Sequence, residues 1–205
     1  MKVLRNLALA AIAAAALMAF LGAGTASATQ LCAFAPAATG PECAGTPQKF
    51  EYSGKITGTS INATLKTNLA NVECEDSHTT ITAFSSTGAP ILGEVDELTF
   101  TGCRTEVTLI PCTVTVKNLP YNASLEGKTL TVSDAVGAGA KVVCGTVLSC
   151  EFLTNEAILA ITNGEPTVAV AKEVGLSHES GTVCPSSATW NATYSVVSPA
   201  GLTVL

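Results

Sequence analysis

Apolar and polar residues alternate one by one along most of the chain from Phe50 onward. A period of two places successive side chains on opposite faces of a β-strand, so each alternating segment predicts a strand with one buried face. No segment shows helical periodicity over three turns. The pattern therefore predicts an all-β fold. The clearest alternating segments are residues 61–65, 113–117, 121–126, 129–133 and 189–196.

Turn signals rich in Gly, Pro and Asn divide this region into about a dozen short strands. Short strands that each have one polar face form either two packed antiparallel sheets or a barrel. The pairs Leu98 with Phe100 and Trp190 with Tyr194 would supply the inward faces of two layers. We therefore expect a disulfide-bonded antiparallel β-sandwich.

Residues 1–28 have the three parts of a signal peptide. Two cations, Lys2 and Arg5, precede an apolar run, and Ala26-Ser27-Ala28 matches the pattern that signal peptidase cleaves. The apolar run is shorter than the roughly 20 residues that a spanning helix needs. We expect cleavage before Thr29 and a secreted, extracellular protein that is not held in a membrane.

The remaining chain is predicted to have two parts. Residues 29–49 contain three prolines and show no alternation, which indicates an irregular N-terminal arm. Residues 50–205 are of the length of one domain and are expected to form a single β-sandwich. A core of this size is stable without a bound group, so no cofactor is expected.

The charge balance restricts the partners. Removal of Lys2 and Arg5 leaves eight of the ten Lys and Arg residues against sixteen Asp and Glu, and Arg104 is then the only arginine. Such an acidic surface cannot gather phosphates, which argues against nucleic acid and anionic membranes as partners. We expect a monomer that meets an unidentified extracellular ligand or surface.

Eight cysteines in an exported chain predict four disulfides. None of their spacings is the paired C-x2-C of a zinc site. Short gaps favour three local bridges, with one long-range bridge left over. An alternative pairs Cys74 with Cys103, because each closes an apolar strand. The pairs expected from the gaps are Cys32–Cys43, Cys103–Cys112, Cys144–Cys150 and Cys74–Cys184.

Five segments of the chain resemble a family of exported all-β proteins. They read ITGTSINATLKTNLANVECEDS, DELTFTGC, CTVTVKNLP, VVCGTVLSCEF and CPSSATWNATYSV, and lie within residues 52–205. The family is an uncharacterised one from high-GC Gram-positive (actinobacterial) soil bacteria. The resemblance implies export, strands and partnered cysteines, and it assigns no activity and no catalytic residue.

The chain has two histidines, each with a carboxylate nearby. His78 with Asp76, and His178 with Glu179, would suit a divalent metal if the two pairs converged. Neither pair has the spacing of a metal motif, so no metal site is expected. We expect both imidazoles to lie in solvated polar turns after strand ends and not to share a site.

No G-x-S-x-G nucleophile motif occurs, and the catalytic residues of any activity stay unassigned. The favoured function is a non-enzymatic extracellular domain that is structural, surface-associated or ligand-binding. One alternative is a secreted hydrolase, which would show a cleft with convergent polar groups. The other is an inhibitor of extracellular hydrolases, for which residues 104–111 would be the exposed loop.

Overall fold

A computed structural model describes residues 28–146 and 148–205, which form thirteen strands. All but the last residue of the expected signal peptide lie outside the described residues. Within the described part, no helix is long and apolar enough to cross a membrane.

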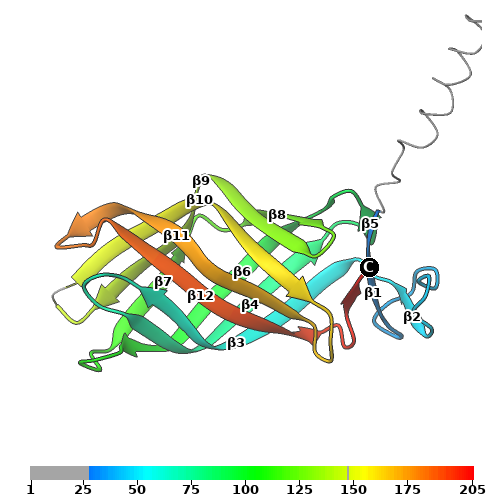
Figure 1. Ribbon diagram of the computed structural model, residues 1–205, viewed down its shortest axis with the longest axis horizontal. Coiled ribbons are helices and arrows are strands. Elements are labelled where there is room, and N and C mark those ends of the chain that lie inside the picture. The colour runs from blue at the N-terminus through cyan, green and yellow to red at the C-terminus, as the bar shows by residue number, and fades with distance from the viewer. Residues whose placement is uncertain (1–27, 147) are drawn as a thin grey trace, which may run out of the picture.

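Eight antiparallel strands close into a barrel, because β9 pairs with β8 on one side and with β10 on the other. The barrel is elongated and its strands cross it obliquely (Figure 1). The all-β prediction is confirmed, but the predicted sandwich is wrong because the sheet closes on itself. In spatial order the strands are β9 (Thr129–Cys144), β10 (Leu148–Thr162), β11 (Val168–Thr182), β12 (Ser187–Ser198), β3 (Gly54–Lys66), β4 (Val72–Ala83), β6 (Ile91–Thr105) and β8 (Tyr121–Glu126).

Irregularities in the barrel strands break the simple alternation at several places, and one of them lies in a single row across β3 and β6. Asn62 on β3 and Gly102 on β6 adopt left-handed φ angles of 63° and 62°. At this row two successive residues face outward, so the order of inward and outward positions reverses. Ile61, which the alternation places inside, is therefore 73% exposed, whereas Ala63 is buried.

One section of the barrel wall is not joined by backbone pairing. β7 (Cys112–Lys117) lies in line with β8, and it pairs with the second half of β9. β6 pairs with β8 as far as Val95 and Tyr121. Backbone pairing resumes at the far end of β6, where Arg104 forms an isolated bridge with Pro111, the residue before β7. In the described chain, the intervening residues of β6 are paired with β4 alone. We call this section, between residues 96–103 of β6 and strand β7, the seam.

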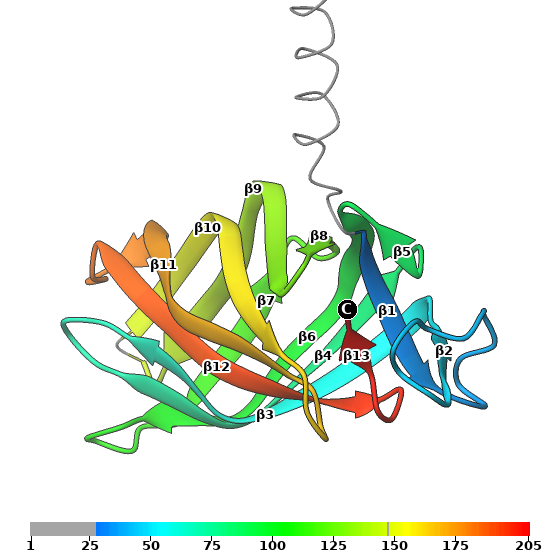
Figure 2. The same ribbon diagram turned by 45° about the vertical axis from the view of Figure 1, so that its right-hand side comes forward.

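A small second sheet covers one end of the barrel (Figure 2). It joins β1 (Thr29–Phe34) to β13 (Thr203–Val204), β2 (Lys49–Glu51) and β5 (Thr87–Gly88). The prediction of an irregular arm is wrong for residues 29–34, which form strand β1. The sequence of this segment does not alternate, and it is extended because it pairs with three other strands.

Contacts with the barrel turns fix this sheet in place. Gly127 N donates to Thr29 Oγ1 at 2.6 Å, and Asn163 Nδ2 donates to the carbonyl of Val204 at 2.8 Å. The side chains of Leu31 and Val204 are both 2% exposed. The sheet is therefore packed as part of one core.

The four disulfides confirm the predicted number and correct most of the predicted pairs. Cys32–Cys43 forms as expected, and the alternative Cys74–Cys103 is also present. The other two bridges are Cys112–Cys144 and Cys150–Cys184. The pairs Cys103–Cys112, Cys144–Cys150 and Cys74–Cys184 were wrong.

Strand register explains the observed pairing. Cys74 lies opposite Cys103 on β4 and β6, and Cys112 lies opposite Cys144 on β7 and β9. Their Cα atoms are 3.9 Å and 4.1 Å apart. The first bridge joins β6 to β4, and the second joins β7 to β9, so each holds a strand of the seam to the strand on its other side. None of the four disulfides joins β6 to β7 across the seam.

We expect the seam to be visible in native-state hydrogen exchange. Strand β6 should show fast exchange at alternate amides within residues 96–103, about a hundredfold or more above those of β12, because only one side of β6 is paired there. Two-dimensional NMR in deuterated water measures the rates. Equal protection on β6 and β12 would contradict an unpaired seam.

Candidate functional site

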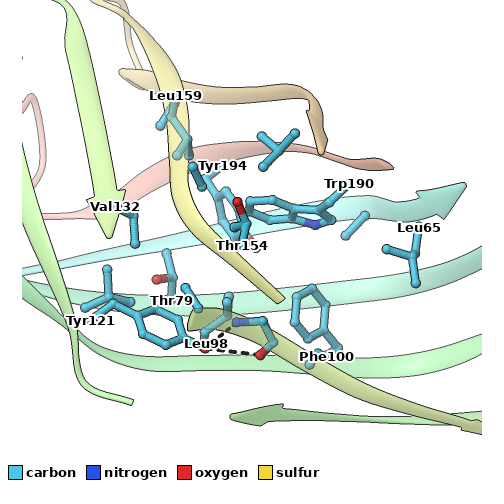
Figure 3. Close-up of a pocket in the computed structure, with 18 of the residues that line it drawn as sticks. Leu65, Thr79, Leu98, Phe100, Tyr121, Val132, Thr154, Leu159, Trp190 and Tyr194 are labelled. Atoms are coloured by element: carbon cyan, nitrogen blue, oxygen red, sulfur yellow. Dashed lines mark hydrogen bonds between the residues drawn. The ribbon is translucent and has the colours of Figure 1, made fainter. Parts of the chain in front are cut away.

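The barrel contains an apolar cavity of about 160 Å³. Inward-facing side chains from the eight barrel strands and from β7 form its wall (Figure 3). An eight-stranded barrel is just wide enough either to be filled by side chains or to hold one small ligand. The largest residues of the wall are Phe100, Tyr121, Phe152, Trp190 and Tyr194.

The space exists because many inward positions carry small residues. Gly58, Ala63, Ala138 and Ala157 all line the cavity. At Gly139 the small residue is required by the backbone, since a Cβ atom there would lie 2.0 Å from the carbonyl oxygen of Phe152. The sequence places Gly and Ala among aromatic residues at inward positions, a mixture that also occurs in filled small barrels, so only the three-dimensional arrangement shows that space is left.

Most polar groups of the cavity wall are already hydrogen-bonded. The Tyr194 hydroxyl bonds Ser77 Oγ at 2.8 Å, and Tyr121 donates to the carbonyl of Lys117 and accepts from Gly139 N. Thr79 Oγ1 donates to the carbonyl of Glu97 at 3.1 Å. These hydroxyls stabilise the wall and are not free to bind a ligand.

The wall carries no charge among the described residues, since Asp, Glu, Lys, Arg and His do not contribute to it. Desolvation on burial raises the pKa of the Tyr194 hydroxyl, and the hydrogen bond with Ser77 only partly opposes this. Burial also raises the pKa of Tyr121. Both phenols therefore stay neutral at physiological pH, and the interior is neutral as well as apolar.

Trp190 forms part of the cavity wall and is half-buried. Its indole ring is tilted by 54° against the Tyr194 ring, with the ring centres 6.2 Å apart. The alternation predicts an inward-facing core position for this residue, and the structure places it between the core and the empty space. The indole nitrogen is buried and has no hydrogen-bond partner.

The two histidines lie within strands, so the prediction that they sit in polar turns was wrong. His78 is on β4 opposite Thr59 and Thr99, and His178 is on β11 near Phe152. β4 continues past His78 because β3 and β6 both continue to pair with it, and β11 continues past His178 because β10 continues to pair with it.

The structure does not bring the four candidate metal ligands together. β3 and β12 separate β4, which carries Asp76 and His78, from β11, which carries His178 and Glu179. Both carboxylates are exposed. No group of three or more His, Cys, Asp or Glu residues within the described ranges is arranged to hold a metal ion.

The loop that was considered as an inhibitory loop connects β6 to β7. Its ends are each tied to another strand, through Cys103 and Cys112. Val107 and Leu109 are exposed at its tip. The disulfides Cys74–Cys103 and Cys112–Cys144 hold the two ends of this loop, whereas the predicted local bridge Cys103–Cys112 does not form.

Comparison with known proteins found no matching family model, no matching curated protein and no matching solved structure. The cavity is therefore the feature from which a function can be inferred.

We expect the protein to lose stability in alkali because of its buried tyrosines. A phenol whose pKa is raised by folding holds its proton more tightly in the folded state than in the unfolded state. Its contribution to the free energy of unfolding is therefore complete below about pH 10 and is lost as the pH rises further. Urea denaturation between pH 8 and 11, with tyrosinate absorbance, measures this decline.

Tyr194→Phe is the control for that decline. The variant leaves the Ser77 hydroxyl buried without a partner, which costs about 1–3 kcal/mol at neutral pH. The difference in stability between wild type and variant should narrow above about pH 10, because only the wild type has Tyr194 to ionise. A difference that stays constant with pH would show that ionisation of Tyr194 does not contribute to the loss of stability in alkali.

Proposed function

We propose that this protein binds one small, neutral, apolar molecule inside its barrel and does so outside the cell. The observation that carries this proposal is the uncharged apolar cavity of about 160 Å³ in the middle of the barrel. A cavity of about 150 Å³ lined by aliphatic and aromatic side chains stays dry and binds benzene in another protein. The interior has the size and the chemistry for a compact hydrophobic ligand.

The seam is a route by which a ligand could reach this cavity. A ligand can enter a barrel through an uncovered end or where the wall separates, and separation at paired strands breaks the hydrogen bonds between them. Leu98 and Phe100 on one side of the seam, and Val114 on the other, are cavity residues and only half-buried. Movement of β7 away from β6 would open the interior without breaking a strand ladder.

The four disulfides indicate an oxidising environment. Together with the signal-peptide pattern of residues 1–28, they support release from the cell. The resemblance to exported all-β proteins agrees with this proposal.

The interior gives less support to a hydrolase. A catalytic site needs an acid, base or nucleophile that can reach the substrate. The hydroxyls of Tyr121, Thr79 and Tyr194 are engaged in hydrogen bonds with the wall, and no described charged residue faces the space. Binding is therefore the function that the geometry favours.

We expect α-methylstyrene to bind the wild-type protein and to change the emission of Trp190, the one tryptophan of the chain. A ligand that binds only the folded state at 100 times its Kd stabilises the protein by about 2.7 kcal/mol. Thermal unfolding and fluorescence titration measure the two effects. Absence of both would refute the proposed function.

Ala157→Leu tests whether the ligand occupies the cavity. Ala157 faces the interior and is 7% exposed, so the larger side chain should fill space and weaken binding at least about tenfold, at a stability cost of about 1–3 kcal/mol. Ile158→Leu is the matched control, because Ile158 is 54% exposed on the outer face of the same strand. Equal weakening by both variants would place the ligand elsewhere.

A further inference from the structure

The indole N–H of Trp190 is a hydrogen-bond donor on the cavity wall that lacks an acceptor. In Figure 3 the nitrogen lies on the edge of the indole that faces Phe100, which is another residue of the cavity wall. An unpaired buried donor destabilises the fold relative to a satisfied one, because it loses its hydrogen bond to water and gains none in return. Buried tryptophan N–H groups usually have a partner, so its absence here needs an explanation.

Trp190 differs in this respect from the other polar residues of the wall. Thr154 Oγ1 donates to the carbonyl of Glu156 at 2.8 Å. The hydroxyls of Thr79 and Tyr121 also donate to backbone carbonyls, as described above. Among the buried side-chain nitrogen and oxygen atoms of the described wall, Trp190 Nε1 alone has no partner. Trp190 Nε1 is therefore the one buried donor of the described wall that lacks an acceptor. Because other atoms cover it, a ligand oxygen reaches it after a small shift of the indole or its neighbours.

We propose that the ligand carries one neutral acceptor oxygen, such as that of a ketone, ester or ether, and that this oxygen accepts a hydrogen bond from Trp190 Nε1. This inference rests on the proposed function and adds the chemical class of the ligand to it. The apolar body of the ligand fills the space between the strands, and the hydrogen bond sets its orientation.

A carboxylate does not fit the same position. Transfer of an ionised group into an apolar interior is costly unless a counter-charge or several donors compensate. The wall offers one neutral donor and, among the described residues, no cation. The site is therefore selective for an uncharged acceptor over the corresponding acid anion.

Three probes of similar size separate these chemistries. Acetophenone and α-methylstyrene have the same shape and differ by a carbonyl oxygen in place of a methylene group, and benzoate adds a negative charge. Their Kd values are measured by calorimetry with wild type and with Trp190→Phe. Because α-methylstyrene is the more hydrophobic, the informative quantity is the ratio of the acetophenone Kd to the α-methylstyrene Kd in each protein.

We expect this ratio to rise about five- to tenfold in Trp190→Phe, because the loss of one neutral hydrogen bond weakens binding of the ketone by about that factor. The cavity enlargement that the variant causes affects both probes and cancels in the ratio. We also expect benzoate to bind the wild type at least about tenfold more weakly than acetophenone. An unchanged ratio, or benzoate binding as tight as that of acetophenone, would overturn the inference.

A second measurement needs no variant. The chain has one tryptophan, so its NMR spectrum contains a single indole N–H signal. Acetophenone should move the indole proton downfield as the hydrogen bond forms, whereas α-methylstyrene should not. If both probes bind and the proton responds equally to both, the inference fails while the proposed function stands. If neither probe binds, the proposed function itself fails.

Discussion

The pairing of β9 with both β8 and β10 is the constraint on which the rest of the structure depends. It turns a sheet with two free edges into a closed wall, and a closed wall of eight strands has an inside whose width is fixed by the number of strands. The residues at inward positions then decide whether that inside is filled or empty. In this chain Gly and Ala residues at many of those positions leave it partly empty.

The empty space destabilises the fold, and the covalent bridges offset this. At about 24 cal/mol per Å³, a cavity of about 160 Å³ costs roughly 4 kcal/mol. Each disulfide contributes about 2–4 kcal/mol, and three of the four close loops of 29, 32 and 34 residues within the barrel. Two of them hold β6 and β7 to their outer neighbours. The seam can therefore separate while the strands beside it stay attached.

The sequence predicts the local features of this fold well and the long-range ones poorly. Alternation correctly places Tyr121 and Ala123 inside, because their strand is regular. It fails at Ile61, because Ile61 and Asn62 both face outward at an irregularity of the strand, which the type of residue 62 alone does not predict. The choice between sandwich and barrel, and the pairing of Cys112 with Cys144, both depend on which distant strands become neighbours. Composition can suggest a cavity, but only closure creates one.

Two features that act over different distances favour the same kind of ligand. The chain beyond the expected signal peptide has an excess of carboxylates, which lowers the local concentration of anions around the protein. Inside, the wall offers the single N–H of Trp190 and, in its described part, no charge. Anions are thus disfavoured at approach and again on burial, whereas a cation meets no counter-charge in the described wall. A neutral molecule with an apolar body and one acceptor oxygen is the class that neither the surface nor the interior rejects.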